Sequence, residues 1–175
     1  MSRSEYRIRR ALLVVWGLDT LLLFCLMMIA LLTRGAATER LIFTLFFLPA
    51  FVFFLECLYR RVAVAEEGLV IRKWGRTKAF PWSDITRVDC LTVRRKVYLL
   101  LTTLGGLFVV SNAFEGFTRL VEQIASRVPA ERIEKDVLPQ AAAAGTGSAV
   151  LIPAWIAAVL MTAMIAMKLL TQAGF

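Results

Sequence analysis

Histidine is absent from this chain of 175 residues, and cysteine occurs only three times. Without imidazole, zinc sites that use histidine and catalysis that depends on histidine are excluded. Cys25 and Cys57 stand in apolar runs and Cys90 in a strand-like segment, so their spacing matches neither a disulfide framework nor a metal site. The sequence also lacks the patterns of a nucleophile elbow and of a phosphate-binding loop. We therefore expect neither an enzyme nor a protein that binds a cofactor or metal.

Acidic residues are few, with 13 Asp and Glu against 21 Lys and Arg and a formal net charge of +8. Hydrophobic residues make up 59% of the chain, which is above the share usual in soluble domains. In a soluble protein the positive excess would suggest a nucleic-acid partner, but the chain lacks a recognition helix or a stacking platform. In a membrane protein the same excess marks the segments that face the cytoplasm. The composition therefore predicts an integral membrane protein that does not bind nucleic acid.

Three long apolar runs predict three membrane-spanning helices, because about 20 apolar residues cross the hydrocarbon core of a bilayer. The first two, Ala11–Leu32 and Leu41–Leu58, form a predicted helical hairpin over residues 11–58, and the third is Ala149–Leu170. A secretory signal peptide is an alternative for the first run, since both begin with basic residues. A signal core has only about 7–15 residues and precedes a cleavage site of small residues, which the following TRGAATER lacks. We therefore expect a retained anchor.

The basic residues around the first two runs predict their orientation. The N-terminal segment 1–10 holds four arginines, and Arg60 and Arg61 follow the second run, whereas the loop between the runs holds Arg34 and Arg40. Lys and Arg are enriched on the cytoplasmic side of spanning helices. We therefore expect the N-terminus and the segment after the second span in the cytoplasm, and the C-terminus on the outer side.

Residues 61–128 form the one long segment that is neither a span nor a linker. Within it, residues 97–110 read VYLLLTTLGGLFVV, which is too short for a span and has two glycines at its centre. The flanking β-branched and aromatic residues predict a β-hairpin. Its strands are either buried on both faces or covered on one face by the next element.

A helix is predicted over residues 114–128, before Pro129. Its apolar residues recur at spacings of three and four and define one packed face: Phe117, Leu120, Val121, Ile124 and Val128. The following residues 129–148 lose this periodicity and include QAAAAGTGS, so we expect a flexible linker to the third span.

Three short segments of the central region resemble the small bacterial PH-like (pleckstrin-homology-like) domains that occur beside membrane helices. They are Glu-Gly-Leu at 67–69, WGRT at 74–77 and FPWSDITRV at 80–88, and the single helix after the last strand also matches in position. The resemblance covers residues 61–128. It implies an α+β domain with a small, partly open antiparallel β-barrel of two sheets that is capped by one C-terminal helix.

The resemblance also implies a binding or assembly module without enzymatic activity, in the bacterial inner membrane. Phosphoinositide recognition does not carry over, because the loop at 65–68 reads Ala-Glu-Glu-Gly and its acidic residues would repel a phosphate. Trp82 and Phe80 are expected to anchor the core rather than contact a ligand.

Basic residues gather in two turns of the central domain. They are candidate contacts for anionic lipid headgroups or for a protein partner, and the alternative is a solvated positive face beside the spans. These residues are Arg72, Lys73, Arg76 and Lys78 in one turn and Arg94, Arg95 and Lys96 in the other.

Asp19 is the residue with the highest expected cost in the chain. It follows Arg10 by nine residues, which places it about 13 Å into the first span, where a carboxylate costs about 3 kcal/mol. We expect this cost to be relieved by protonation, by a hydroxyl such as that of Thr44, or by a neighbouring subunit. Lys168 lies near the other end of its span, too distant in depth to reach Asp19, and is expected to extend towards the interface.

These observations favour a non-enzymatic accessory or assembly subunit of a membrane complex. Its partner would be another membrane protein or a second copy of the chain. An alternative is a module that senses anionic lipid at the membrane surface. A third possibility is a subunit of a transporter or channel, which would have to be oligomeric because three spans are too few for a monomeric pore.

Overall fold

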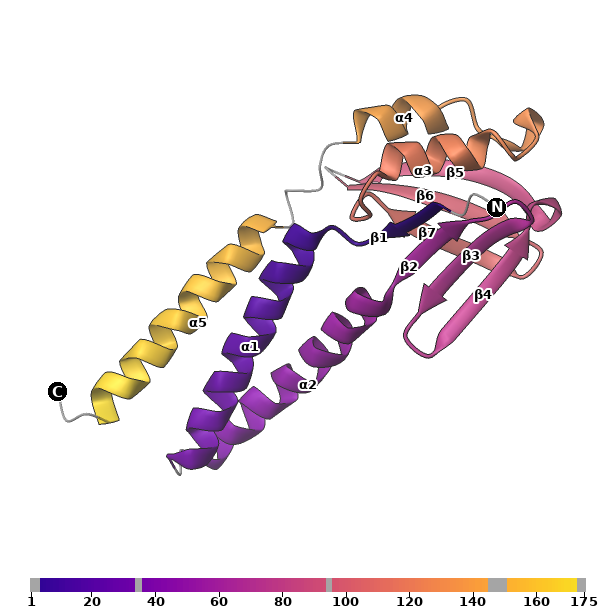
Figure 1. Cartoon of the computed structure of the whole chain (residues 1–175). Coiled ribbons are helices and arrows are strands. Elements are labelled where there is room, and N and C mark those ends of the chain that lie inside the picture. Colours follow the sequence, from indigo (N-terminus) through magenta and orange to yellow (C-terminus); the bar gives the residue numbers. More distant parts are fainter. Residues whose placement is uncertain (1–3, 34–35, 94–95, 145–150, 173–175) are drawn as a thin grey trace. The chain divides into compact units, whose positions relative to one another are not determined.

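The computed structural model describes residues 4–33, 36–93, 96–144 and 151–172 (Figure 1). The chain divides into two compact units. We call them the helical unit, formed by residues 10–58 and 149–175, and the sheet unit, formed by residues 1–9 and 59–148.

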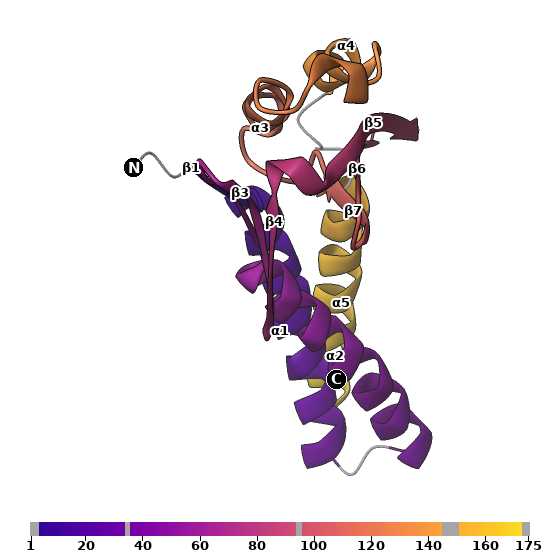
Figure 2. The same ribbon diagram turned by 90° about the vertical axis from the view of Figure 1, so that its right-hand side faces the viewer.

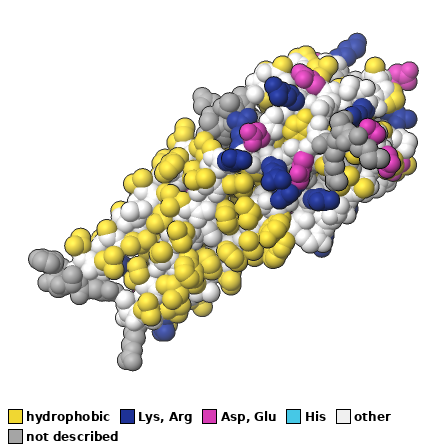
Figure 3. All heavy atoms as spheres, in the orientation of Figure 1, with side chains coloured by type: hydrophobic (Ala, Val, Ile, Leu, Met, Phe, Trp, Pro, Cys, Tyr) yellow, Lys and Arg dark blue, Asp and Glu magenta, His cyan; other side chains and the backbone are white. Residues whose placement is uncertain are grey.

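The helical unit contains the three predicted spans. Helices α1 (Arg10–Leu32), α2 (Ala37–Tyr59) and α5 (Leu151–Gln172) are each long and apolar enough to cross a membrane. Apolar side chains cover much of their visible surface, whereas most charged side chains lie on the sheet unit (Figure 3). The three helices therefore fit the prediction of a membrane protein.

Helix α1 packs directly against α5 and contacts α2 through aromatic rings. Trp16 meets Phe53 edge to face with 5.2 Å between ring centroids, and Phe24 lies 5.4 Å from Phe47. Gly17 faces Phe54 so closely that an added Cβ would lie 3.2 Å from the ring. The aromatic residues of the second span thus serve its contact with the first.

The sheet unit consists of two antiparallel sheets that are not closed into a barrel, in contrast to the partly open barrel that the resemblance implies (Figure 2). The first sheet has the order β1-β2-β3-β4 and the second has the order β5-β6-β7. Their strands are β1 (Ser4–Arg7), β2 (Arg61–Val64), β3 (Gly68–Lys73), β4 (Arg76–Pro81), β5 (Ile85–Val93), β6 (Lys96–Thr103) and β7 (Gly106–Ser111). A 3-10 turn, η1 (Trp82–Asp84), joins the sheets.

The hairpin predicted over residues 97–110 is confirmed as β6 and β7. Buried and more exposed residues alternate along β6, so only one face of this hairpin is buried. The predicted helix is α3 (Phe117–Ala125), which is shorter than expected because Gly116 precedes it with a φ of 67°. Its predicted apolar face is confirmed, since all five residues are buried: Phe117, Leu120, Val121, Ile124 and Val128.

The N-terminal residues belong to the sheet unit, which corrects the prediction of a separate basic segment 1–10. Strand β1 pairs antiparallel with β2, from Ser4 opposite Val64 to Arg7 opposite Arg61. The amide of Glu115 donates to the carbonyl of Arg7 at 2.8 Å, which ties β1 to the segment before α3. The α1–α2 hairpin is therefore inserted between two neighbouring strands of one sheet.

The described part of the predicted linker 129–148 is folded, which corrects the expectation of a flexible tether. It contains a 3-10 turn, η2 (Ala130–Arg132), and helix α4 (Val137–Ala143), in which Val137 is fully buried. The amide of Glu134 donates to the carbonyl of Val88 at 3.1 Å. This segment thus covers the outer edge of β5, which would otherwise be open to pairing with another chain.

Candidate functional site

The first basic turn forms the tip of the β3–β4 hairpin. Lys73 pairs with Arg76, and Trp74 and Gly75 make a two-residue turn that Gly75 permits through its φ of 68°. Arg72, the neighbour of Lys73, is also exposed. Side chains alternate between the two faces of a strand, so Arg72 lies on one face of the hairpin and Lys73 and Arg76 on the other. Both faces of the hairpin therefore carry basic residues close to the exposed indole of Trp74.

Lys78, also predicted for this turn, has a different environment. Its ammonium lies 5.2 Å from the centre of the Phe108 ring, and the Phe80 ring is 4.3 Å from the same ring. These contacts link β4 to β7 at the edge of the core. The exposed Lys78 therefore contacts a ring of the other sheet, and Phe80 is half-buried at the edge of the core rather than inside it.

Trp82 is half-buried and held by polar contacts. Its indole N–H donates to the carbonyl of Glu66 at 3.0 Å, and the guanidinium of Arg127 lies 5.6 Å from its ring. The ring thus links η1 to the turn before β3 and to the residues that follow α3. This structural role agrees with the expectation that Trp82 is not a ligand contact.

The second basic turn is described only in part, because Arg94 and Arg95 lie outside the described residues. Lys96 is exposed and pairs with Val93 at the start of β6. The two basic turns belong to different sheets. Lys96 therefore does not share a strand pair with the β3–β4 tip.

Asp19 lines a cavity of about 200 Å³ within the helical unit. All three long helices contribute to its wall, which is almost entirely apolar. Beside Asp19 it is lined by Trp16, Thr20, Leu23, Ala50, Phe53, Phe54, Ala157 and Met161.

The Oδ1 atom of Asp19 is buried and has no hydrogen-bond partner among the described residues. The hydroxyl of Thr20, its neighbour in the cavity, donates to the carbonyl of Trp16 at 2.7 Å. The hydroxyl of Thr44, an expected partner of Asp19, donates instead to the carbonyl of Arg40 at 2.8 Å. An unsatisfied carboxylate oxygen in apolar surroundings is costly, so this cavity favours a ligand that brings a hydrogen-bond donor.

An ion pair that the sequence analysis missed joins α2 and α5. The ammonium of Lys168 lies 2.7 Å from the Glu39 carboxylate and 5.9 Å from the centre of the Phe43 ring. Lys168 therefore has a partner within the chain, in contrast to the expectation that it only extends towards the interface. The sequence signal for this pair was the opposite charge of Glu39 and Lys168, which stand near the same end of two different apolar helices.

Reversing either charge of this pair is expected to weaken the packing of α5 on α2 by about 1 kcal/mol, because both side chains are partly exposed. We expect Glu39→Lys and Lys168→Glu each to lower the midpoint of thermal unfolding of the purified chain in detergent. The double reversal restores the attraction and should recover most of the loss. A double variant no more stable than the single variants would show that the pair does not contribute.

Among the described residues, Cys90 is a thiol inside the sheet unit. Cys90 is buried, and burial together with the neighbouring carboxylate of Asp89 raises the pKa of its thiol to about 11. The thiol is therefore protonated near neutral pH and a poor nucleophile. Among the described residues, Asp, Glu and Cys side chains form no cluster that could hold a metal ion.

Comparison with known proteins places most of the chain in one family. Residues 2–125 match the model of a family of unknown function, DUF6585. The match begins just before β1 and ends with the last residue of α3, so it includes both strands that flank the α1–α2 hairpin. Helices α4 and α5 lie outside the matched residues. No curated protein matches the chain.

Proposed function

Because the chain belongs to the DUF6585 family, whose function is unknown, we propose a function from its own residues: a non-enzymatic accessory or assembly subunit of a membrane complex. The partner is another membrane protein or a second copy of the chain. The observation that carries this proposal is the buried, unpartnered carboxylate oxygen of Asp19 in an apolar cavity of the helical unit.

We propose that the sheet unit is a PH-like domain, which serves binding rather than catalysis. Four-stranded and three-stranded antiparallel sheets followed by a helix support this assignment. The segments that carry the resemblance have structural roles, since Trp82 holds the turn before β3 and Phe80 packs on Phe108. A module of this kind would present a partner surface without active-site residues.

The proposed topology places the sheet unit in the cytoplasm of a bacterium, with the C-terminus outside the inner membrane. Pairing of β1 with β2 requires that both strands lie on the same side of the membrane. Two crossings by α1 and α2 meet this requirement, and one further crossing by α5 takes the C-terminus to the opposite side. The arginines that flank α1 and α2 favour the cytoplasm for the sheet unit.

The proposed contact at Asp19 is with a spanning helix of the partner that supplies a hydroxyl, amide or basic group. Among the described residues that line the cavity, two besides Asp19 have polar side-chain groups: the indole of Trp16 and the hydroxyl of Thr20, which is already bonded. A carboxylate near the centre of a span costs about 3 kcal/mol, and a hydrogen bond from a second helix reduces this cost.

We expect Asp19→Leu to remove the chain from its complex, and Asp19→Asn to retain part of the association through its amide. The measurement is purification from the native membrane in a mild detergent, followed by native mass and identification of each chain that co-purifies. Wild-type chain should run as a defined hetero-complex or homo-oligomer, whereas the leucine variant should run as a monomer.

Leu21→Ala is a matched control for this experiment. Leu21 is two residues from Asp19, so it projects from the opposite side of α1, and it is 57% exposed. We expect this variant to keep the complex. If Asp19→Leu left both abundance and complex mass unchanged, or if the wild-type chain were monomeric, the proposed role of Asp19 would be wrong.

A further inference from the structure

We propose that the tip of the β3–β4 hairpin is a binding site for anionic phospholipid headgroups, with Trp74 entering the interface of the bilayer. Arg72, Lys73 and Arg76 supply the positive charge. This site involves only the sheet unit and is independent of the contact made by Asp19.

The register of the first sheet shows at which end of the sheet the tip lies. In β1 and β3 the chain runs in the same direction, since both are antiparallel to β2. One row across the four strands holds Arg7, Arg61, Arg72 and Thr77. Trp74 follows this row by two residues, or about 7 Å at the usual rise of a strand.

The same end of the sheet carries the covalent connections to two spans. After Arg7 the chain reaches the start of α1 at Arg10, and α2 ends at Tyr59, two residues before Arg61. The tip with Trp74 therefore extends from the row in the direction in which the chain leaves for α1. Because this row lies only two or three residues along the chain from α1 and α2, the short connections limit how far this end of the sheet can lie from a bilayer that holds the two helices.

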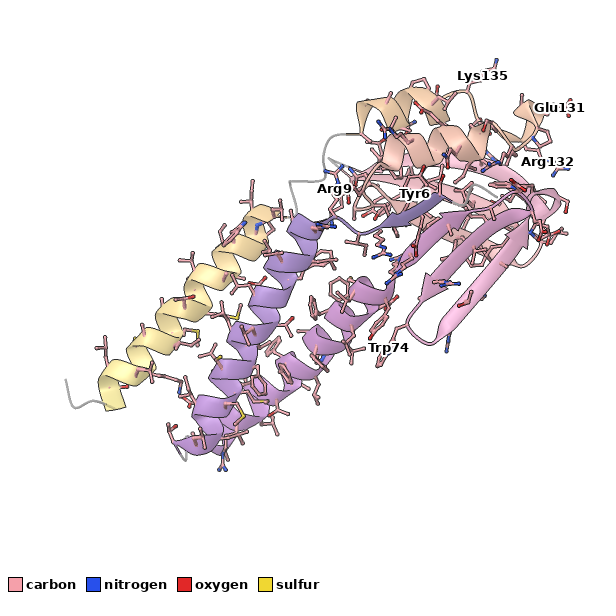
Figure 4. The ribbon with its side chains drawn as sticks, viewed as in Figure 1. Tyr6, Arg9, Trp74, Glu131, Arg132 and Lys135 are labelled. Carbon is pink, nitrogen blue, oxygen red and sulfur yellow. The ribbon has the colours of Figure 1, made fainter. Side chains whose placement is uncertain are left out.

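Trp74 differs from Trp82 in a way that fits a membrane contact. The indole of Trp82 is hydrogen-bonded within the fold, whereas Trp74 is 51% exposed at the apex of the turn, where Figure 4 shows it. Leaving a large ring in water forfeits its hydrophobic stabilisation. Tryptophan is enriched where proteins meet the membrane interface, because its ring is apolar and its N–H is polar.

The basic residues at the tip are available for an external anion. At the same end of the sheet, Glu5 lies 3.2 Å from both Arg7 and Arg61, and hydrogen bonds from Arg7 and then Arg61 lower the pKa of its carboxyl. Within the described ranges, no carboxylate lies within 4.0 Å of the three basic residues of the tip. Their unpaired charge complements the anionic cytoplasmic surface of a membrane.

Each basic residue near an anionic surface strengthens binding about fivefold, so three together strengthen it about a hundredfold. The attraction is screened over about 8 Å at physiological ionic strength, so it should weaken in high salt. Covalent attachment keeps the tip near the bilayer and raises its effective concentration there.

The test places the photo-cross-linker benzoylphenylalanine at position 74 of the full chain, reconstituted alone in vesicles of phosphatidylcholine with phosphatidylglycerol. We expect mass spectrometry to find a phospholipid adduct. The matched control carries the same cross-linker at Leu104, which is also exposed at a hairpin turn. The amide of Leu104 donates to the carbonyl of Asp84, which follows the end of β4 opposite the tip. Position 104 is therefore about 20 Å from the tip and should give no adduct.

The combined variant Arg72→Gln, Lys73→Gln and Arg76→Gln, and vesicles of phosphatidylcholine alone, test the role of charge. We expect a large loss of the adduct at position 74 in both cases, and a similar loss in high salt. No lipid adduct at position 74, or equal yields at positions 74 and 104, would overturn the membrane site. A yield unaffected by charge, lipid or salt would overturn the assignment of anionic headgroups. Matching unfolding midpoints show that the variants remain folded.

Discussion

Replacing Gly68 with alanine is expected to lower the stability of the sheet unit by about 3 kcal/mol or more. A Cβ at this position would overlap the carbonyl oxygen of Phe80 and lie 2.8 Å from the Cα of Pro81. Both are backbone atoms of the paired strand β4, so the clash cannot be relieved by rotation of a side chain. Relief requires separation of β3 from β4 at the start of their ladder.

The size of this effect can be measured by unfolding the purified full chain in detergent, with circular dichroism of the aromatic side chains as the signal. Gly105→Ala is the control, because its added Cβ would meet its nearest neighbours at an ordinary distance of 3.8 Å. We expect little change there. Equal midpoints for Gly68→Ala and Gly105→Ala would contradict the close approach of β3 and β4.

Ile8→Ala is expected to destabilise the sheet unit by about 2–5 kcal/mol, the range for truncation of a buried aliphatic side chain. Ile8 is only 5% exposed and forms a bridge with Phe114, which is 1% exposed. Its loss would leave a cavity beside the largest fully buried ring of the core. The same unfolding measurement tests this expectation.

Glu5→Gln provides the comparison within the same strand. Glu5 is partly exposed in its pairs with Arg7 and Arg61, and such ion pairs contribute only about 0–1 kcal/mol. A large effect at Ile8 with a small effect at Glu5 is expected if residues 4–9 complete the sheet and core. If residues 1–9 were a free tail, neither substitution would change stability.

Features that depend on neighbouring residues were predictable from the sequence. Periodicity or length within one segment predicts the three long apolar helices, the hairpin around Gly105 and Gly106, and the buried face of α3. Their boundaries were less predictable. The second helix begins at Ala37 rather than Leu41, because a helix continues through polar residues that hydropathy assigns to the loop.

The N-terminal strand shows why other features could not be predicted. The segment SEYR alternates between less and more exposed positions, but four residues with nearby arginines match a topology signal equally well. Its partner strand begins at Arg61, beyond two spans. Helix α4 was missed for a similar reason, since its alanines fit a linker and only packing against α3 and β5 distinguishes the two.

The candidate sites also include features that the sequence predicted and features that only the structure shows. The sequence identified Asp19 by its depth and the basic turns by their charge, because both are properties of a residue and its neighbours in the chain. It did not distinguish Lys78, whose ammonium lies over the Phe108 ring, from the basic residues at the tip. Nor did it single out Trp74, whose exposure depends on its place at the apex of a turn.

The sequence by itself determined that the chain has three long apolar helices that could cross a membrane and that it has no histidine chemistry, because hydropathy and composition act locally. Only the tertiary structure decided that the first strand and the second enclose a helical hairpin, that Glu39 pairs with Lys168, and that Asp19 faces a cavity without a partner. These features arise from contacts between segments far apart in the chain, and such contacts leave no periodic signal in either segment.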